Sequence, residues 1–187
     1  MSASNNLRSP ARFVTGHNID GASIFESSID ERPPTNKFGD DMQIMFCYGT
    51  QGFPIDVSEG KDMQNYENLV QNPPGILVPD GSAARIIDFA PGYTTPMHRS
   101  MSLNYNFVIE GEVEVLLDSG ESRILKRGDM LVQRAIKHFW RNTSTTEWAR
   151  ITAVVLPVQD FSVGGRTVKQ DLSSRSEQEG KEEGNGT

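Results

Sequence analysis

The chain has 187 residues, of which 36% are hydrophobic and 23% charged, with 17 glycines and 10 prolines, a composition typical of one globular domain with many turns. Its net charge of -7 argues against a surface that binds nucleic acid, and the lack of any run of about 18 apolar residues argues against a membrane partner. The polar start, Met1 to Arg12, does not have the pattern of a signal peptide, and the single Cys47 is typical of a reducing compartment, so we expect a cytoplasmic protein.

The first half of the chain predicts a loose N-terminus followed by a few short strands. Residues 1–11 are polar and terminal, so we expect them to be flexible. Runs rich in β-forming residues predict strands at 12–15, 23–28 and 42–48, and Pro33 and Pro34 separate the last two. The one predicted helix is short and lies at 61–70.

The second half predicts strands in quick succession, at 84–89, 104–109, 113–117, 122–125, 130–133, 138–141 and 148–156. About ten short strands with almost no helix favour an all-β fold, either a closed barrel or a two-sheet jelly roll, because an open sheet would expose long edges. Residues 166–187 hold only two large apolar side chains, so we expect a disordered acidic tail after a single domain over 12–165.

Two motifs in this half each place a histidine beside glycine-bounded strands. The first runs from Gly92 through His98 to Gly111, and the second runs from Gly128 through His138 to Asn142. In both motifs the sequence resembles the cupin superfamily, although the interval from Gly128 to His138 is one residue shorter than in the second cupin motif. Over 85–157, the sequence is similar to the small single-domain cupins of bacterial and fungal natural-product pathways, including polyketide pathways.

The resemblance implies a cupin-type jelly-roll β-barrel with N-terminal strands and one short helix, in which the motif core at 85–157 turns its histidines inward. Dimers that use the N-terminal strands are common in the superfamily. Strand alternation turns Tyr105, Phe107 and Ile109 outward, and together with Phe13 and Ile24 they supply more apolar surface than one small barrel leaves exposed. We therefore expect a homodimer.

The metal-binding pattern of the superfamily is only half present. Its second histidine is replaced by Ser100 and its glutamate by Asn104, so the resemblance assigns only His98 and His138 as ligands. Neutral hydroxyl and amide oxygens are weak ligands for Fe²⁺ or Zn²⁺, and we therefore favour no metal cofactor. If a metal binds, its ligands would be His98, His138 and Asn104, and His17 could join only by folding over the barrel mouth.

Strand alternation also predicts which side chains face the barrel cavity. Asn104 and Asn106 share one face, and His138 shares its face with Trp140, while Met97 lies on the approach. An apolar and aromatic cavity with a few polar groups suits a small hydrophobic organic substrate. The predicted substrate-binding residues are Met97, Ser100, Asn104, Asn106 and Trp140.

The favoured function is that of a tailoring enzyme of secondary metabolism, a lyase or isomerase that uses His98 and His138 as general acid and base. Isomerisation, dehydration, cyclisation and decarboxylation of a polyketide-like substrate all fit, with Ser100 and Asn104 bonding a carbonyl or enolate oxygen. The first alternative is an Fe- or Zn-dependent oxygenase or lyase. The second is a non-catalytic protein that binds a small molecule. A separate interpretation takes both histidines as hydrogen-bonded core residues of the barrel without a function.

Overall fold

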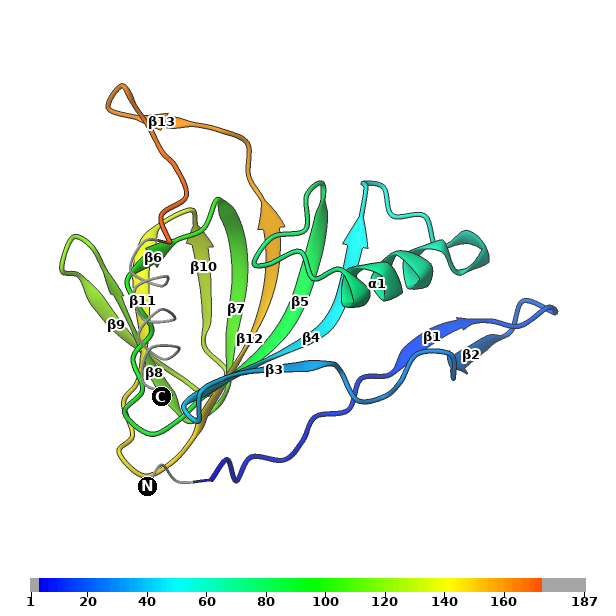
Figure 1. Ribbon diagram of the computed structural model, residues 1–187, viewed down its shortest axis with the longest axis horizontal. Helices are drawn as coiled ribbons and strands as arrows, with labels where there is room; N and C mark the ends of the chain where they lie inside the picture. The colour runs from blue at the N-terminus through cyan, green and yellow to red at the C-terminus, as the bar shows by residue number, and fades with distance from the viewer. Residues whose placement is uncertain (1–3, 173–187) are drawn as a thin grey trace, which may run out of the picture.

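Ten of the fourteen strands in the described residues form two antiparallel sheets with the core between them. The computed structural model describes residues 4–172. The larger sheet has six strands in the order β10 (Met130–Arg134), β7 (Ser102–Glu110), β12 (Ala149–Pro157), β5 (Gly81–Phe89), β4 (Met42–Gln51) and β3 (Thr35–Phe38). The smaller sheet, at the left of Figure 1, has four strands in the order β6 (His98–Arg99), β11 (Lys137–Asn142), β8 (Glu112–Leu117) and β9 (Ser122–Lys126).

Alternation along the strands builds the core. On β7, Asn106 and Val108 are buried and Tyr105 is exposed, as the sequence predicts. Both sheets contribute apolar side chains to one cluster, which consists of Met42, Phe89, Val108, Val113, Val115, Leu125, Trp140, Ala149 and Ile151. The predicted all-β fold with one short helix is confirmed.

The helix and two hairpins lie outside the two sheets. Helix α1 (Lys61–Gln71) follows a 3₁₀ turn, η1 (Ser58–Gly60), and packs on β4, where the Tyr66 and Phe46 ring centroids are 5.4 Å apart. Strands β1 (Val14–His17) and β2 (Ser23–Glu26) form an arm that extends away from the barrel in Figure 1, and β13 (Ser162–Val163) pairs with β14 (Arg166–Thr167). Within residues 4–172, no helix is long and apolar enough to cross a membrane.

Two turns of the barrel depend on glycine. Gly120 has a φ of 89° in the turn between β8 and β9, and Gly111 has a φ of 75° between β7 and β8. A β-carbon on Gly111 would also lie 3.1 Å from the Cβ of Ala149. Any other residue would therefore strain the turn that joins the two sheets.

The start of the chain is more ordered than the sequence predicts. Residues 4–11 lie against the large sheet, where Asn5 donates a hydrogen bond of 2.8 Å to Asp88. Arg150 donates a bond of 2.7 Å to the carbonyl of Arg8 and forms a buried ion pair with Asp88 at 2.6 Å. Composition predicts flexibility for this segment because it has few apolar side chains. The polar contacts that hold it in place depend on the fold and cannot be deduced from composition.

The start of the expected tail is ordered as well. Residues 166–167 form β14, and the backbone of Asp171 exchanges two hydrogen bonds with Arg99 of β6. The Asp171 carboxylate also forms an ion pair of 2.6 Å with Lys137 of β11. The expectation of disorder is therefore wrong for 166–172, and its remaining part, 173–187, lies outside the described residues.

Several strands differ from their predicted bounds. Strand β1 lies two residues later than the predicted 12–15, and the prediction missed β3, β6, β13 and β14. Strand β3 follows two prolines and has the polar sequence TNKF, so only its pairing with the edge of β4 makes it a strand. Strand β6 has just two residues and is defined by its pairing with β11.

Candidate active site

The two motif histidines lie side by side at the edge of the small sheet. His98 of β6 and His138 of β11 are direct partners across the antiparallel pair. Their ring centroids are 4.5 Å apart, with the ring planes inclined by 48°. His138 is only 4% exposed, whereas His98 is half-buried. The structure therefore brings together the two residues that the sequence singles out for catalysis.

Backbone carbonyls determine the tautomer of both rings. The Nδ1 atom of His98 lies 2.8 Å from the Pro96 carbonyl oxygen, and Nδ1 of His138 lies 3.2 Å from that of Ile136. A carbonyl oxygen only accepts hydrogen bonds, so Nδ1 of each ring carries the proton. In the neutral form, Nε2 of each imidazole is then the unprotonated nitrogen, the atom that can accept a proton or a hydrogen bond.

The two rings differ in electrostatic setting. Burial, together with the adjacent His98 ring, lowers the pKa of His138 from 6.5 to about 3. His138 is therefore uncharged at neutral pH. This argues against its acting as a cationic proton donor, one of the roles expected from the sequence.

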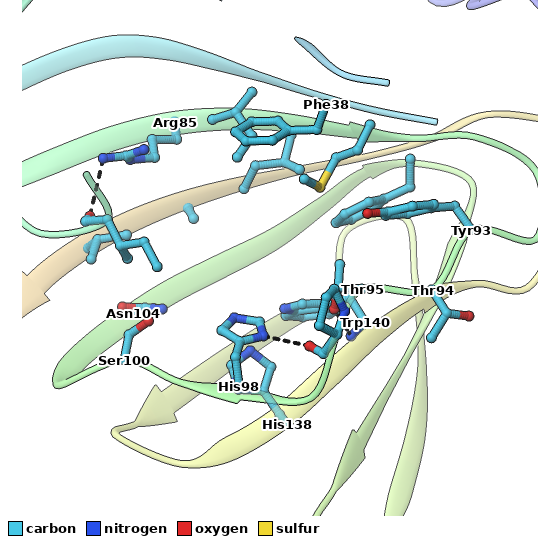
Figure 2. Close-up of a pocket in the computed structure, with 18 of the residues that line it drawn as sticks. Phe38, Arg85, Tyr93, Thr94, Thr95, His98, Ser100, Asn104, His138 and Trp140 are labelled. Carbon is cyan, nitrogen blue, oxygen red and sulfur yellow. Dashed lines mark hydrogen bonds between the residues drawn. The ribbon is translucent and has the colours of Figure 1, made fainter. Parts of the chain in front are cut away.

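The histidines line a cavity of about 420 Å³ between the two sheets. Figure 2 shows His98, Ser100 and Asn104 on one side of it, with Phe38 and Arg85 opposite. The apolar part of the lining comes mainly from β4, β5, β11 and β12, which contribute Met42, Ile44, Ile87, Phe89, Trp140, Ala153 and Val155. A site of this size and lining can hold a small, largely apolar organic molecule.

The predicted substrate-binding residues divide into two groups. Ser100, Asn104 and Trp140 line the cavity. Asn106 is buried behind the lining and donates a 2.8 Å hydrogen bond to Gln133, and Met97 lies outside the lining. Asn104 also differs from its expected role: its amide group donates to Gln133 at 3.3 Å, so its oxygen, an acceptor, remains for a ligand.

Several residues that line the cavity were not predicted from the sequence. Gln133 is opposite Asn104 on the neighbouring strand β10, and alternation along β10 could have indicated it. Arg85 of β5 lies across the cavity, donates to the carbonyls of Gly75 and Ile76, and places its guanidinium 5.4 Å from the centre of the Phe46 ring. Arg85 shares one face of β5 with Ile87 and Phe89, so alternation along that predicted strand could have indicated it. Phe38 lies on β3, a strand that was not predicted from the sequence.

The described side chains around the two histidines do not supply the ligands of a catalytic metal centre. Within residues 4–172, no three His, Cys, Asp or Glu side chains gather as a metal site requires. His17 is exposed on the β1–β2 arm, away from the cavity. The Asn104 oxygen is buried and has no hydrogen-bond partner in the described part of the chain, but it is a neutral amide oxygen. Two imidazoles with neutral oxygens do not fit a catalytic Fe²⁺ or Zn²⁺ centre, which usually has three strong protein ligands.

Comparisons with known proteins agree with these motifs. The family model described as a cupin domain matches residues 85–155. Phomopsin biosynthesis cluster protein D of Diaporthe leptostromiformis is 42% identical over 86% of this chain and 85% of its own length. Oryzines biosynthesis cluster protein J of Aspergillus oryzae is 34% identical over 86% of this chain and 90% of its own. A cupin-domain-containing oxidoreductase of Aspergillus ruber is 38% identical over 88% of this chain and 84% of its own length.

Proposed function

Because this chain belongs to the cupin family and has relatives named after secondary-metabolite clusters, we propose that it is a tailoring enzyme of secondary metabolism. Its substrate is a small, largely hydrophobic organic molecule bound between the sheets. The observation that supports this most is the pair of histidine rings, 4.5 Å apart, on the wall of an apolar cavity. We assign proton-transfer chemistry to this histidine pair.

His98 is the proton-transfer group in this proposal. Its Nδ1–H is held by the Pro96 carbonyl, so Nε2 is the basic atom that removes a proton from the substrate. His138 stays neutral because of its low pKa. Its Nδ1–H donates to the Ile136 carbonyl, so its Nε2 accepts a hydrogen bond from the substrate in this proposal. The burial of His138 thereby limits the pair to a single added proton.

The remaining polar groups of the cavity bind the substrate oxygen. Ser100 carries a hydroxyl and Gln133 carries an amide N–H group, so both can donate to a carbonyl that gains negative charge as a neighbouring carbon loses its proton. Trp140 and the apolar strands orient the carbon skeleton and exclude water. Return of the proton to another carbon is an isomerisation, and loss of a leaving group completes a dehydration.

A redox reaction is the second candidate function. It is favoured by relatives such as the one from Aspergillus ruber, which is named an oxidoreductase. The two candidates differ in the product. An isomerisation leaves the substrate mass unchanged, a dehydration or decarboxylation removes water or CO₂, and an oxidation removes hydrogen or adds oxygen.

The test incubates the purified protein with the metabolites that accumulate in a strain lacking its gene and follows product masses. We expect the loss of water or CO₂, or an isomer with changed retention, and a rate that falls roughly 10²- to 10⁴-fold in His98→Gln. His17→Gln is the matched control, because His17 lies outside the cavity. Loss of hydrogen or gain of oxygen would favour the redox candidate, and no turnover of any accumulated metabolite would favour a binding protein.

A further inference from the structure

Three amide side chains from adjacent strands form a hydrogen-bonded group, here called the amide wall, of which two line the cavity and the third, Asn106, lies behind them. Asn104 and Asn106 lie on β7, and Gln133 lies on β10, directly across from Asn104. Gln133 is only 3% exposed, and both it and Asn104 line the cavity. This amide wall is separate from the two histidines, and the mechanism proposed above uses only the N–H group of Gln133.

The hydrogen bonds within the amide wall are unequally distributed. Both asparagines donate to the same atom, Oε1 of Gln133, at 3.3 Å from Asn104 and 2.8 Å from Asn106. This sharing leaves Oδ1 of Asn104 and Nε2 of Gln133 buried without a hydrogen-bond partner among the described residues. Flipping one amide alone would set like groups against each other. The orientation of the whole wall is anchored by Asn106, whose N–H group also lies 3.4 Å from the Leu131 carbonyl oxygen, a group that only accepts hydrogen bonds.

Leaving two such groups unsatisfied is unfavourable, and buried polar groups in folded proteins are rarely left so. We propose that the amide wall binds a carboxamide group of the substrate. The ligand N–H donates to Oδ1 of Asn104, and the ligand carbonyl accepts from Nε2 of Gln133. This inference rests on the proposed function, because it takes the cavity to be the substrate site.

Other functional groups match the wall less well. A carboxylate would place an oxygen against Oδ1 of Asn104 and add a charge there, whereas Arg85 lies across the cavity. A ketone or an ester has no hydrogen to donate to Asn104. An amide offers one donor and one acceptor on neighbouring atoms, as the wall requires.

The test compares four small probes of similar shape with the full-length wild-type protein. Benzamide, acetophenone, benzoate and toluene are titrated separately, and binding is followed by the chemical shifts of backbone amides around the cavity. We expect benzamide to bind roughly tenfold more tightly than acetophenone or benzoate, because only benzamide satisfies both groups of the wall. Equal binding of benzamide and acetophenone would overturn the inference.

Two variants separate the donor from the acceptor. Asn104→Leu should bring benzamide binding down to that of acetophenone, whereas Gln133→Met should weaken both probes by a similar factor. Asn68→Leu is the matched control, because Asn68 is an exposed helix residue outside the cavity. A preference for benzamide that persists in Asn104→Leu would contradict the assignment, and the wild-type comparison decides the question if that variant does not fold.

The same titrations distinguish failure of this inference from failure of the proposed function. If toluene and acetophenone bind in the cavity but benzamide has no advantage, the cavity is a ligand site without the proposed amide recognition. If none of the four probes shifts the cavity signals, the cavity is not a site for small apolar molecules. That result would overturn the proposed function together with the inference.

Discussion

At the scale of single residues, the two histidines are equivalent in sequence motif and different in chemistry. Each ring is held by the carbonyl two residues before it, so both present Nε2 as an acceptor. Their burial differs, and the more buried His138 has the lowered pKa. A buried neutral imidazole binds protons less readily than the same residue in the unfolded chain, which links His138 to the pH dependence of stability.

The first prediction concerns this linkage. The pKa of His138 is about 3 in the folded chain and near 6.5 when unfolded, so the unfolded state takes up a proton first as the pH falls. We expect the free energy of unfolding to drop by about 2 kcal/mol between pH 6.5 and pH 5 because of this group. Urea titrations of wild type and His138→Gln measure it, with His17→Gln as control. Parallel pH profiles for wild type and His138→Gln would contradict the prediction.

The second prediction concerns the two departures from the metal-binding pattern. Ser100 and Asn104 line the cavity with His98 and His138, so Ser100→His with Asn104→Glu restores a ligand set of three histidines and one carboxylate. We expect the double variant to keep one Zn²⁺ or Fe²⁺ per chain through gel filtration and the wild type to keep far less. Elemental analysis of both gel-filtered proteins, each first incubated with the metal, measures this. Wild-type protein that retains a full equivalent would show that the neutral oxygens suffice.

At the scale of elements, both ends of the chain attach to the barrel through polar contacts. Residues 4–11 are bonded to the buried Asp88–Arg150 pair on the large sheet. Asp171 extends the small sheet beyond β6, which carries His98 and would otherwise be an edge of two residues. The C-terminal contact therefore bears on the position of a proposed catalytic residue.

The third prediction is a comparison of two truncations. A chain ending at residue 165 loses the Asp171 backbone bonds to Arg99 and the ion pair with Lys137, whereas a chain ending at 172 keeps them. We expect the shorter chain to have a melting temperature lower by about 4 °C than the longer one, since roughly 1 kcal/mol corresponds to that shift. Calorimetry on both chains measures the difference. Equal melting temperatures would show that the Asp171 contact adds nothing to stability.

At the scale of the whole molecule, apolar side chains gather on the outer face of the large sheet. Phe107 is paired across the strands with Met130, and Tyr105 with Val132, and all four are exposed. Phe13 and Phe25 are exposed on the β1–β2 arm, where their rings meet edge to face. Apolar surface on this scale is typical of a protein interface.

The fourth prediction is that this face joins two copies of the chain. We expect sedimentation to show a homodimer at micromolar concentration and Phe107→Glu with Val132→Lys to give monomers, because two charges would be buried in the interface. Ile124→Glu is the control, since Ile124 is exposed on β9 of the other sheet. A wild-type monomer at that concentration would contradict the prediction.

The sequence by itself determined the fold class, most of the strands and the inward histidines. Strand alternation depends only on the two-residue period of the backbone, so Asn106, Val108, His138 and Trp140 could be assigned to the interior without coordinates. The turn at Gly120 could also be predicted from the sequence, because its positive φ depends only on the residues of the turn itself.

Only the tertiary structure decided the features that depend on contacts between distant segments. Gln133 acquired a role because β10 pairs with β7, and Arg85 because a loop supplies its carbonyl partners. The lowered pKa of His138 follows mainly from burial, which no motif encodes. Local periodicity determines which way a side chain points, whereas hydrogen-bond partners and desolvation are set by which strands become neighbours.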